Sequence, residues 1–144
     1  MKNIFHLGRY LFPLSFLLYV ALHLGKPDVG ASFVPDYLPF PYFWNYFTLV
    51  CILAFIVSAV IGKYDQLAYL LMALYVFLMA LLVHLPRAMG FELGTEMMAA
   101  NLAREQELEM VNVFRNLMIC GALLAFSGFI AKDSTGLPKS FSEM

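Results

Sequence analysis

The chain has 144 residues, of which 62% are hydrophobic and only 13% are charged. A typical soluble domain has about 25% charged residues, and a small domain leaves much of its surface in water. This composition excludes a soluble enzyme and a disordered tail, and it indicates a protein that folds in lipid. The net charge of -1 provides no basic surface for phosphates, which excludes a nucleic-acid binder.

Four segments are apolar enough to cross a bilayer as helices. A spanning helix needs about 20 mostly apolar residues. Two charge-free runs meet this length, 37–62 and 66–86. Two shorter runs, 10–25 and 116–131, reach it only by including one arginine each, whose guanidinium can extend towards the lipid headgroups. These arginines are Arg9 and Arg115.

From these runs we predict an all-α fold. It is an integral membrane four-helix bundle in a single domain, 1–133, followed by a short cytoplasmic tail, 134–144. Pro13 should kink the first span. Because no small-residue cleavage pattern follows Met1 and Lys2, we expect an uncleaved span rather than a signal peptide. The predicted spans are 4–24, 43–62, 66–86 and 111–131.

The lysine and arginine residues beside the spans predict the orientation. Five lie on the side of the two termini and four on the opposite side, and cytoplasmic flanks carry the excess. We therefore expect both termini in the cytoplasm and a bacterial-type inner membrane. The five are Lys2, Arg9, Lys63, Lys132 and Lys139.

The connections between the spans differ in character. Residues 62–65 predict a tight cytoplasmic hairpin. The outer connection 25–42 is too rich in proline for a long helix, and its apolar residues should press against the bundle as a cap. In the acidic outer connection 87–110, Gly94 and Thr95 predict the start of an interfacial helix that runs into the fourth span.

Polar side chains gather at the outer ends of all four predicted spans. Two spans carry a histidine followed three residues later by a cation, and the fourth carries polar residues at i, i+3 and i+4. Polar groups are costly in lipid unless they face one another or a wet cavity, so we predict a shared pocket beneath the proline-rich loop. Alternatively, these groups only snorkel to headgroups or satisfy helix ends. The candidates are His23, Lys26, Asn45, His84, Arg87, Asn112, Arg115 and Asn116.

These residue types suit a quinone. Neutral imidazole and asparagine can bind its carbonyl oxygens, a cation can stabilise the quinol anion, and histidine can relay a proton. His23 and His84 could instead ligate one b-type haem, which is the less favoured option because both rings would have to point inward at matched depth. No metal site is predicted. Cys51 and Cys120 are expected to be buried thiols that act as small apolar residues.

Several segments resemble the DoxX family of small four-span membrane proteins, and the likeness runs over nearly the whole chain. The second span departs from the family pattern, because Thr48 to Ile52 supplies neither the glycine nor the glutamate that members often carry there. The resemblance implies a membrane subunit linked to oxidoreductase systems, such as thiosulfate:quinone oxidoreduction or oxidative-stress complexes. The similar segments are His23-Leu-Gly-Lys26-Pro27, Val34 to Pro41, Leu67-Ala68, His84-Leu-Pro86-Arg87 and Asn112 to Asn116.

We therefore predict the quinone-facing or membrane-anchoring subunit of an oxidoreductase complex, surrounded by membrane lipids and bound to a soluble or membrane redox subunit. The alternative is a non-enzymatic membrane scaffold or assembly partner that binds another subunit through its outer loops. Methionines in the 87–110 connection favour such adaptable protein contacts. They are Met89, Met97, Met98 and Met110.

Overall fold

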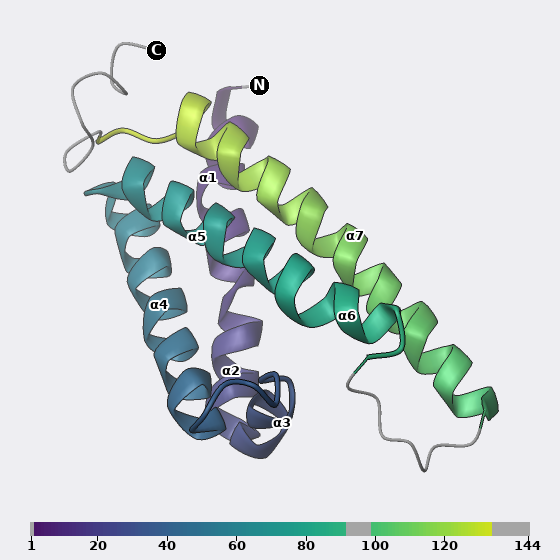
Figure 1. Cartoon of the computed structure of the whole chain (residues 1–144). Helices are drawn as coiled ribbons and strands as arrows, with labels where there is room; N and C mark the ends of the chain where they lie inside the picture. Colours follow the sequence, from purple (N-terminus) through teal and green to yellow (C-terminus); the bar gives the residue numbers. More distant parts are fainter. Residues whose placement is uncertain (1, 92–98, 134–144) are drawn as a thin grey trace.

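The computed structural model describes residues 2–91 and 99–133, and every regular element within these ranges is helical. This confirms the predicted all-α fold (Figure 1). The elements are α1 (Lys2–Ser15), α2 (Leu17–Gly25), α3 (Pro27–Ser32), α4 (Pro41–Ile61), α5 (Asp65–Met79), the π-helix η1 (Ala80–His84), α6 (Leu85–Ala88) and α7 (Ala99–Phe129).

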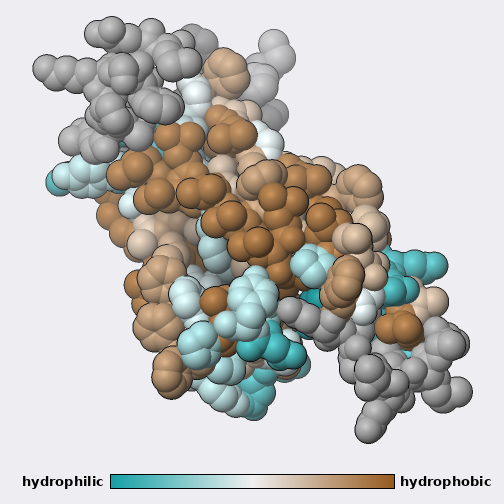
Figure 2. Space-filling model, viewed as in Figure 1, coloured by the Kyte–Doolittle hydropathy of each residue, from teal (hydrophilic) through white to brown (hydrophobic). Residues whose placement is uncertain are grey.

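Four helical segments are long and apolar enough to cross a membrane. Their outward sides are strongly apolar, as Leu18, Val50 and Met118 are 65%, 63% and 73% exposed. Figure 2 shows hydrophobic residues over much of the visible face. Soluble monomers rarely expose contiguous apolar surface on this scale, so the chain is a multi-pass membrane protein. The segments are Leu7–Gly25, Pro41–Ile61, Asp65–Ala88 and Asn101–Phe129.

The first span is broken between α1 and α2, three residues after Pro13. Pro13 has no backbone N–H and therefore cannot bond to the carbonyl of Arg9. The next turn is also weakened, because the Ser15 hydroxyl donates to the Phe12 carbonyl (2.6 Å) and the Phe16 N–H reaches only Pro13 (3.2 Å). The expected kink is thus an interruption at Phe16.

The fourth span belongs to a much longer helix. With 31 residues, α7 is about 46 Å long, whereas the hydrocarbon core is about 30 Å thick. The predicted interfacial helix and the fourth span therefore form one continuous element. Its predicted start at Gly94 and Thr95 lies outside the described residues, as does the tail 134–144.

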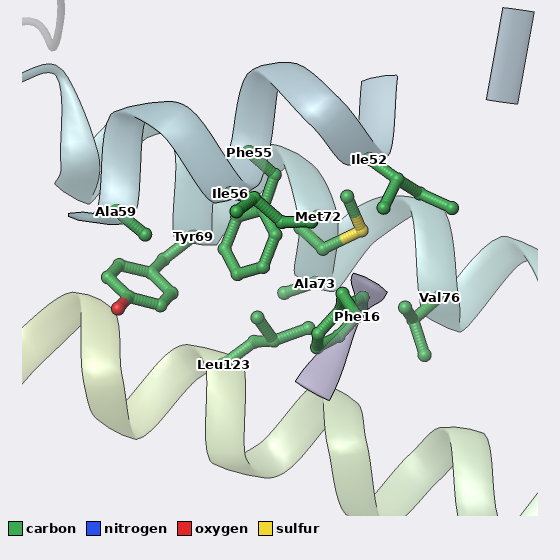
Figure 3. Packing of buried hydrophobic residues seen from close by; sticks show 10 residues of the cluster. All are labelled: Phe16, Ile52, Phe55, Ile56, Ala59, Tyr69, Met72, Ala73, Val76 and Leu123. Carbon is green, nitrogen blue, oxygen red and sulfur yellow. The ribbon is translucent and has the colours of Figure 1, made fainter. Parts of the chain in front are cut away.

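The helices pack in chain order around one core. α4 contacts α1, α2, α3 and α5, and α5 in turn packs along α7. Aromatic rings join all four spans, with Phe16 against Phe55 (5.0 Å between centroids), Phe55 against Tyr69 (5.3 Å) and Tyr69 against Phe126 (5.6 Å). Figure 3 shows Met72 and Leu123 pointing into the same cluster.

We call the end of the bundle that carries Arg9 and Lys132 the terminal end, and the end that carries α3 and α6 the loop end. Figure 1 shows the ribbons of α4 and α7 close at the terminal end and diverging towards the loop end. Different contacts therefore hold the helices together at the two ends.

A buried ion pair holds the helices together at the terminal end. Asp65 is fully buried, and it accepts hydrogen bonds from the Arg9 guanidinium (2.8 Å) and from the backbone N–H groups of Lys132 and Asp133. Arg9 also donates to the Ile130 carbonyl (2.7 Å). These bonds tie α1, the α4–α5 turn and the end of α7 together.

The Asp65→Asn variant tests the contribution of this ion pair to stability. It leaves the buried Arg9 guanidinium without a counter-charge, so we expect a loss of about 3 kcal/mol of unfolding free energy. Thermal unfolding of the protein in detergent micelles measures the effect. Asp36→Asn is the control, because Asp36 is exposed. Equal melting temperatures for the two variants would contradict the assigned role of Asp65.

Candidate functional site

His84 is placed by the π-helix near the end of the third span. The backbone N–H of Leu85 donates to the carbonyl of Ala80, five residues back, which defines a π-turn. Pro86 gives a physical reason, because its ring would clash with the Leu82 carbonyl in a regular α-helix. The wider turn leaves His84 only 8% exposed, facing α7.

The partner of His84 is Glu109, a buried carboxylate on α7. Glu109 Oε2 lies 2.6 Å from His84 Nδ1 and accepts a second bond from Asn112 Nδ2 (3.3 Å). Its other oxygen, Oε1, accepts from Arg87 Nε (2.9 Å). Both carboxylate oxygens are therefore engaged, and Glu109 is only 3% exposed. We call His84, Arg87, Glu109 and Asn112 the Glu109 cluster.

The chemistry of the Glu109 cluster fixes the histidine tautomer. A carboxylate beside an arginine only accepts hydrogen bonds, so His84 Nδ1 must be the donor. Nε2 makes no hydrogen bond with the residues that the structure describes. The imidazole thus keeps one nitrogen for a ligand, while a buried carboxylate holds the ring in place.

Phe33 covers the Glu109 cluster from the loop side. It follows directly after α3, and its ring lies under the Arg87 guanidinium (5.1 Å) and beside the His84 ring (6.2 Å between centroids). A guanidinium on an aromatic face is attracted by the ring quadrupole. The proline-rich connection therefore contributes a side chain to the site, as expected of a cap.

A second polar cluster joins α2 to α4. His23 Nδ1 donates to Asn45 Oδ1 (2.6 Å), and Asn45 Nδ2 donates back to the His23 carbonyl (3.1 Å). Asn45 is only 2% exposed. Gly30 of α3 lies directly on this pair, since a Cβ at Gly30 would be 1.8 Å from Asn45 Oδ1. The pair thus holds α3 in place. Phe33 follows directly after α3, so its position depends on this contact.

The structure divides the predicted pocket residues rather than gathering them. Three of them surround Glu109, two form the α2–α4 pair, and Asn116 is buried further along α7 with its Nδ2 unpartnered. Lys26 and Arg115 are exposed and contact no described polar partner, in keeping with the snorkelling alternative. Two surface hollows lie elsewhere, one at residues 40–43 and one between α5 and α7.

Sequence reasoning missed Glu109, which it assigned to an acidic outer connection. The signal was present, because Glu109, Asn112 and Asn116 follow a helical spacing of three and four residues. A helix over this stretch was already predicted, so the spacing was available, and only the direction in which Glu109 faces was missing. Asp65 was likewise assigned to a turn, although it is buried.

The described residues offer little for metal chemistry. They contain no group of three or more histidine, cysteine, aspartate or glutamate side chains arranged to hold a metal ion. The histidines proposed for haem lie in separate hydrogen-bonded clusters. Cys51 and Cys120 are free thiols, and both are half-buried rather than fully buried.

Comparison with known proteins gives no further guide. No family model, curated protein or solved structure matches the chain. The resemblance to the DoxX family therefore stays a prediction.

Gly30→Ala tests how tightly α3 is seated. The added methyl group would overlap Asn45 Oδ1, so we expect a loss of about 1–3 kcal/mol of unfolding free energy. Gly25→Ala is the matched control, because a Cβ there meets nothing within 4 Å. Thermal unfolding in micelles compares the two. Unchanged stability of Gly30→Ala would mean that α3 is not held against this pair.

Proposed function

We propose that this chain is the quinone-binding membrane subunit of an oxidoreductase complex, with its ring-binding site at the Glu109 cluster. One observation supports this above all. His84 is oriented by a buried carboxylate through Nδ1 and keeps Nε2 without a protein partner among the described residues. When Nε2 also carries a proton, the ring held in this way can donate a hydrogen bond to a carbonyl oxygen and pass that proton to it.

Quinone reduction fits the groups of this cluster. A quinone takes up two electrons and two protons to become a quinol. A partner redox subunit, such as a flavoprotein, supplies both electrons, because imidazole, guanidinium and carboxylate side chains do not. In the proposal, the imidazolium form of His84 donates its Nε2 proton to a ring oxygen and is left as neutral imidazole with its proton on Nδ1. Nε2 then takes up a proton again from water, while the second proton comes from water directly.

Arg87 contributes charge to the same step. Its Nε is bound to Glu109, but its Nη groups make no hydrogen bond with any described residue. They can therefore stabilise the negative charge that develops on the ring oxygen beside His84. Glu109 in turn holds the His84 ring in place through Nδ1.

The proposal includes a location. The excess of lysine and arginine beside the terminal end supports a cytoplasmic position for both termini, in a bacterial-type inner membrane. The Glu109 cluster then lies at the non-cytoplasmic end. In this orientation, the redox subunit would dock on the outer side.

A thermal-shift titration tests quinone binding. A short-chain benzoquinone or naphthoquinone should raise the melting temperature of the purified protein in a concentration-dependent way, because it binds only the folded state. His84→Leu should reduce this shift strongly. Arg115→Leu is the control and should keep it, since Arg115 is exposed on α7 and belongs to neither polar cluster. The proposal fails if the wild type shows no shift, or if His84→Leu shows the full shift.

The second candidate function is a scaffold that holds another subunit. It is favoured by large apolar side chains exposed in the connections at the loop end, where Phe40, Met89 and Phe91 are 77%, 63% and 61% exposed. Changing these three residues to serine should abolish co-purification of a partner subunit but leave the quinone shift intact. Loss of both properties would not support a separate scaffold role.

A further inference from the structure

One face of α7 carries a row of functional groups from the Glu109 cluster into the membrane. Glu109, Asn112, Asn116 and Cys120 follow at intervals of three, four and four residues, which places them along one side of the helix. Over the 11 residues from Glu109 to Cys120 the helix rises about 16 Å. The row therefore runs from the loop end to the middle of the span.

Asn116 is the unexplained member of this row. It is only 8% exposed, and its Nδ2 is completely buried without a hydrogen-bond partner among the described residues. Its Oδ1 also makes no hydrogen bond with them. A buried amide of this kind is costly in an apolar span unless something else bonds to it. A ligand that carries a hydrogen-bond acceptor to this depth would satisfy Asn116 Nδ2, which is one of three such buried atoms among the described residues and the one that lies on this row.

An apolar hollow continues the row on the side of α5. It has a volume of about 360 Å³ and is lined by Cys120, one turn beyond Asn116, with Leu124 after it. The facing residues come from α5, and Leu74 and Phe77 among them are 54% and 39% exposed. The complete lining is Leu70, Ala73, Leu74, Phe77, Cys120 and Leu124.

The order of these features matches an amphipathic lipid with a polar ring and a long apolar tail. The His84 imidazole of η1 comes first, an unpartnered amide second and an apolar hollow third, in this order along α7. A phospholipid chain would explain the hollow but not a buried amide far below the headgroups. A neighbouring helix would explain the hollow but not the free nitrogen of His84.

We propose that the α5–α7 seam is the tail groove of a prenylated quinone, whose ring is held between His84 and an Asn116 Nδ2 hydrogen bond and whose tail lies in the Cys120 hollow. This inference rests on the proposed function. It adds a route of entry, because the ligand would reach the site laterally from the bilayer. It also assigns recognition of the prenyl tail to residues of α5 and α7.

Cys120 provides a reporter for the tail, and Cys51 is an internal control. The two are the only cysteines in the chain, and Cys51 lies on α4, outside the hollow. The rate of labelling by a membrane-permeable maleimide is measured at each cysteine by mass spectrometry. The ligands are one quinone ring with a long prenyl tail, the same ring without a tail, and a phospholipid.

The tailed quinone should slow labelling of Cys120 several-fold and leave Cys51 unchanged. The tailless quinone should raise the melting temperature but leave Cys120 reactive. Asn116→Leu should weaken binding of both quinones about tenfold, as expected for the loss of one buried hydrogen bond. Asn101→Leu, at an exposed position of the same helix, is the matched control.

The outcomes separate the two proposals. If the tailless quinone shifts the melting temperature but the tailed one does not protect Cys120, the ring site stands and the tail groove is wrong. If the phospholipid protects Cys120 as well as the tailed quinone does, the groove binds lipid chains in general and the inference is overturned. If neither quinone shifts the melting temperature, the proposed function and the groove fail together.

Discussion

A charge in an apolar environment must find its counter-charge within the protein, and this constraint organises the bundle at both ends. The third span is held twice by an arginine and a buried carboxylate. Arg9 binds Asp65 where the span begins, and Arg87 binds Glu109 where it ends. In both cases the two residues come from different spans. The pairing therefore sets the lateral contacts as well as the charge balance.

The two pairs differ in how completely they are satisfied. Around Asp65, both carboxylate oxygens accept bonds from a guanidinium or from backbone N–H groups, so the carboxylate has no open position, although Arg9 Nε is buried without a partner among the described residues. Around Glu109, one of the donors is an imidazole with a second nitrogen to offer. Proton exchange requires such an open position, and this is why the candidate site lies at the loop end of the same helix.

Much of the fold could be predicted from the sequence, because a helix that spans a bilayer requires a long run of uncharged, mostly apolar residues. The spans around 43–62 and 66–86 agree with α4 and with the segment from α5 to α6 within a few residues. Pro13 indicated the break in the first span. These features depend on composition and on local backbone chemistry, which a single sequence displays.

The candidate site was less predictable, because it depends on which way side chains point. The depth of a residue follows from its position along a helix, but its direction depends on how the helices pack. Arg115 and Asn116 are neighbours in sequence, yet one is exposed and the other buried. Glu109 was misassigned for a related reason, since an acidic residue near a span boundary normally faces water.

The π-turn in the third span has a consequence for how this protein can tolerate insertions and deletions. One extra residue is accommodated between the apolar core of α5 and the polar groups at His84 and Arg87. If the same residues formed a regular α-helix instead, everything beyond this turn would be rotated by about 100°, because an α-helix has 3.6 residues per turn. The imidazole would then swing away from α7, while α5 kept its packing. A one-residue deletion between α5 and the π-turn would turn His84 away from Glu109 in the same way, whereas a deletion within the π-turn would only replace it with a regular helical turn and keep the two sides in register.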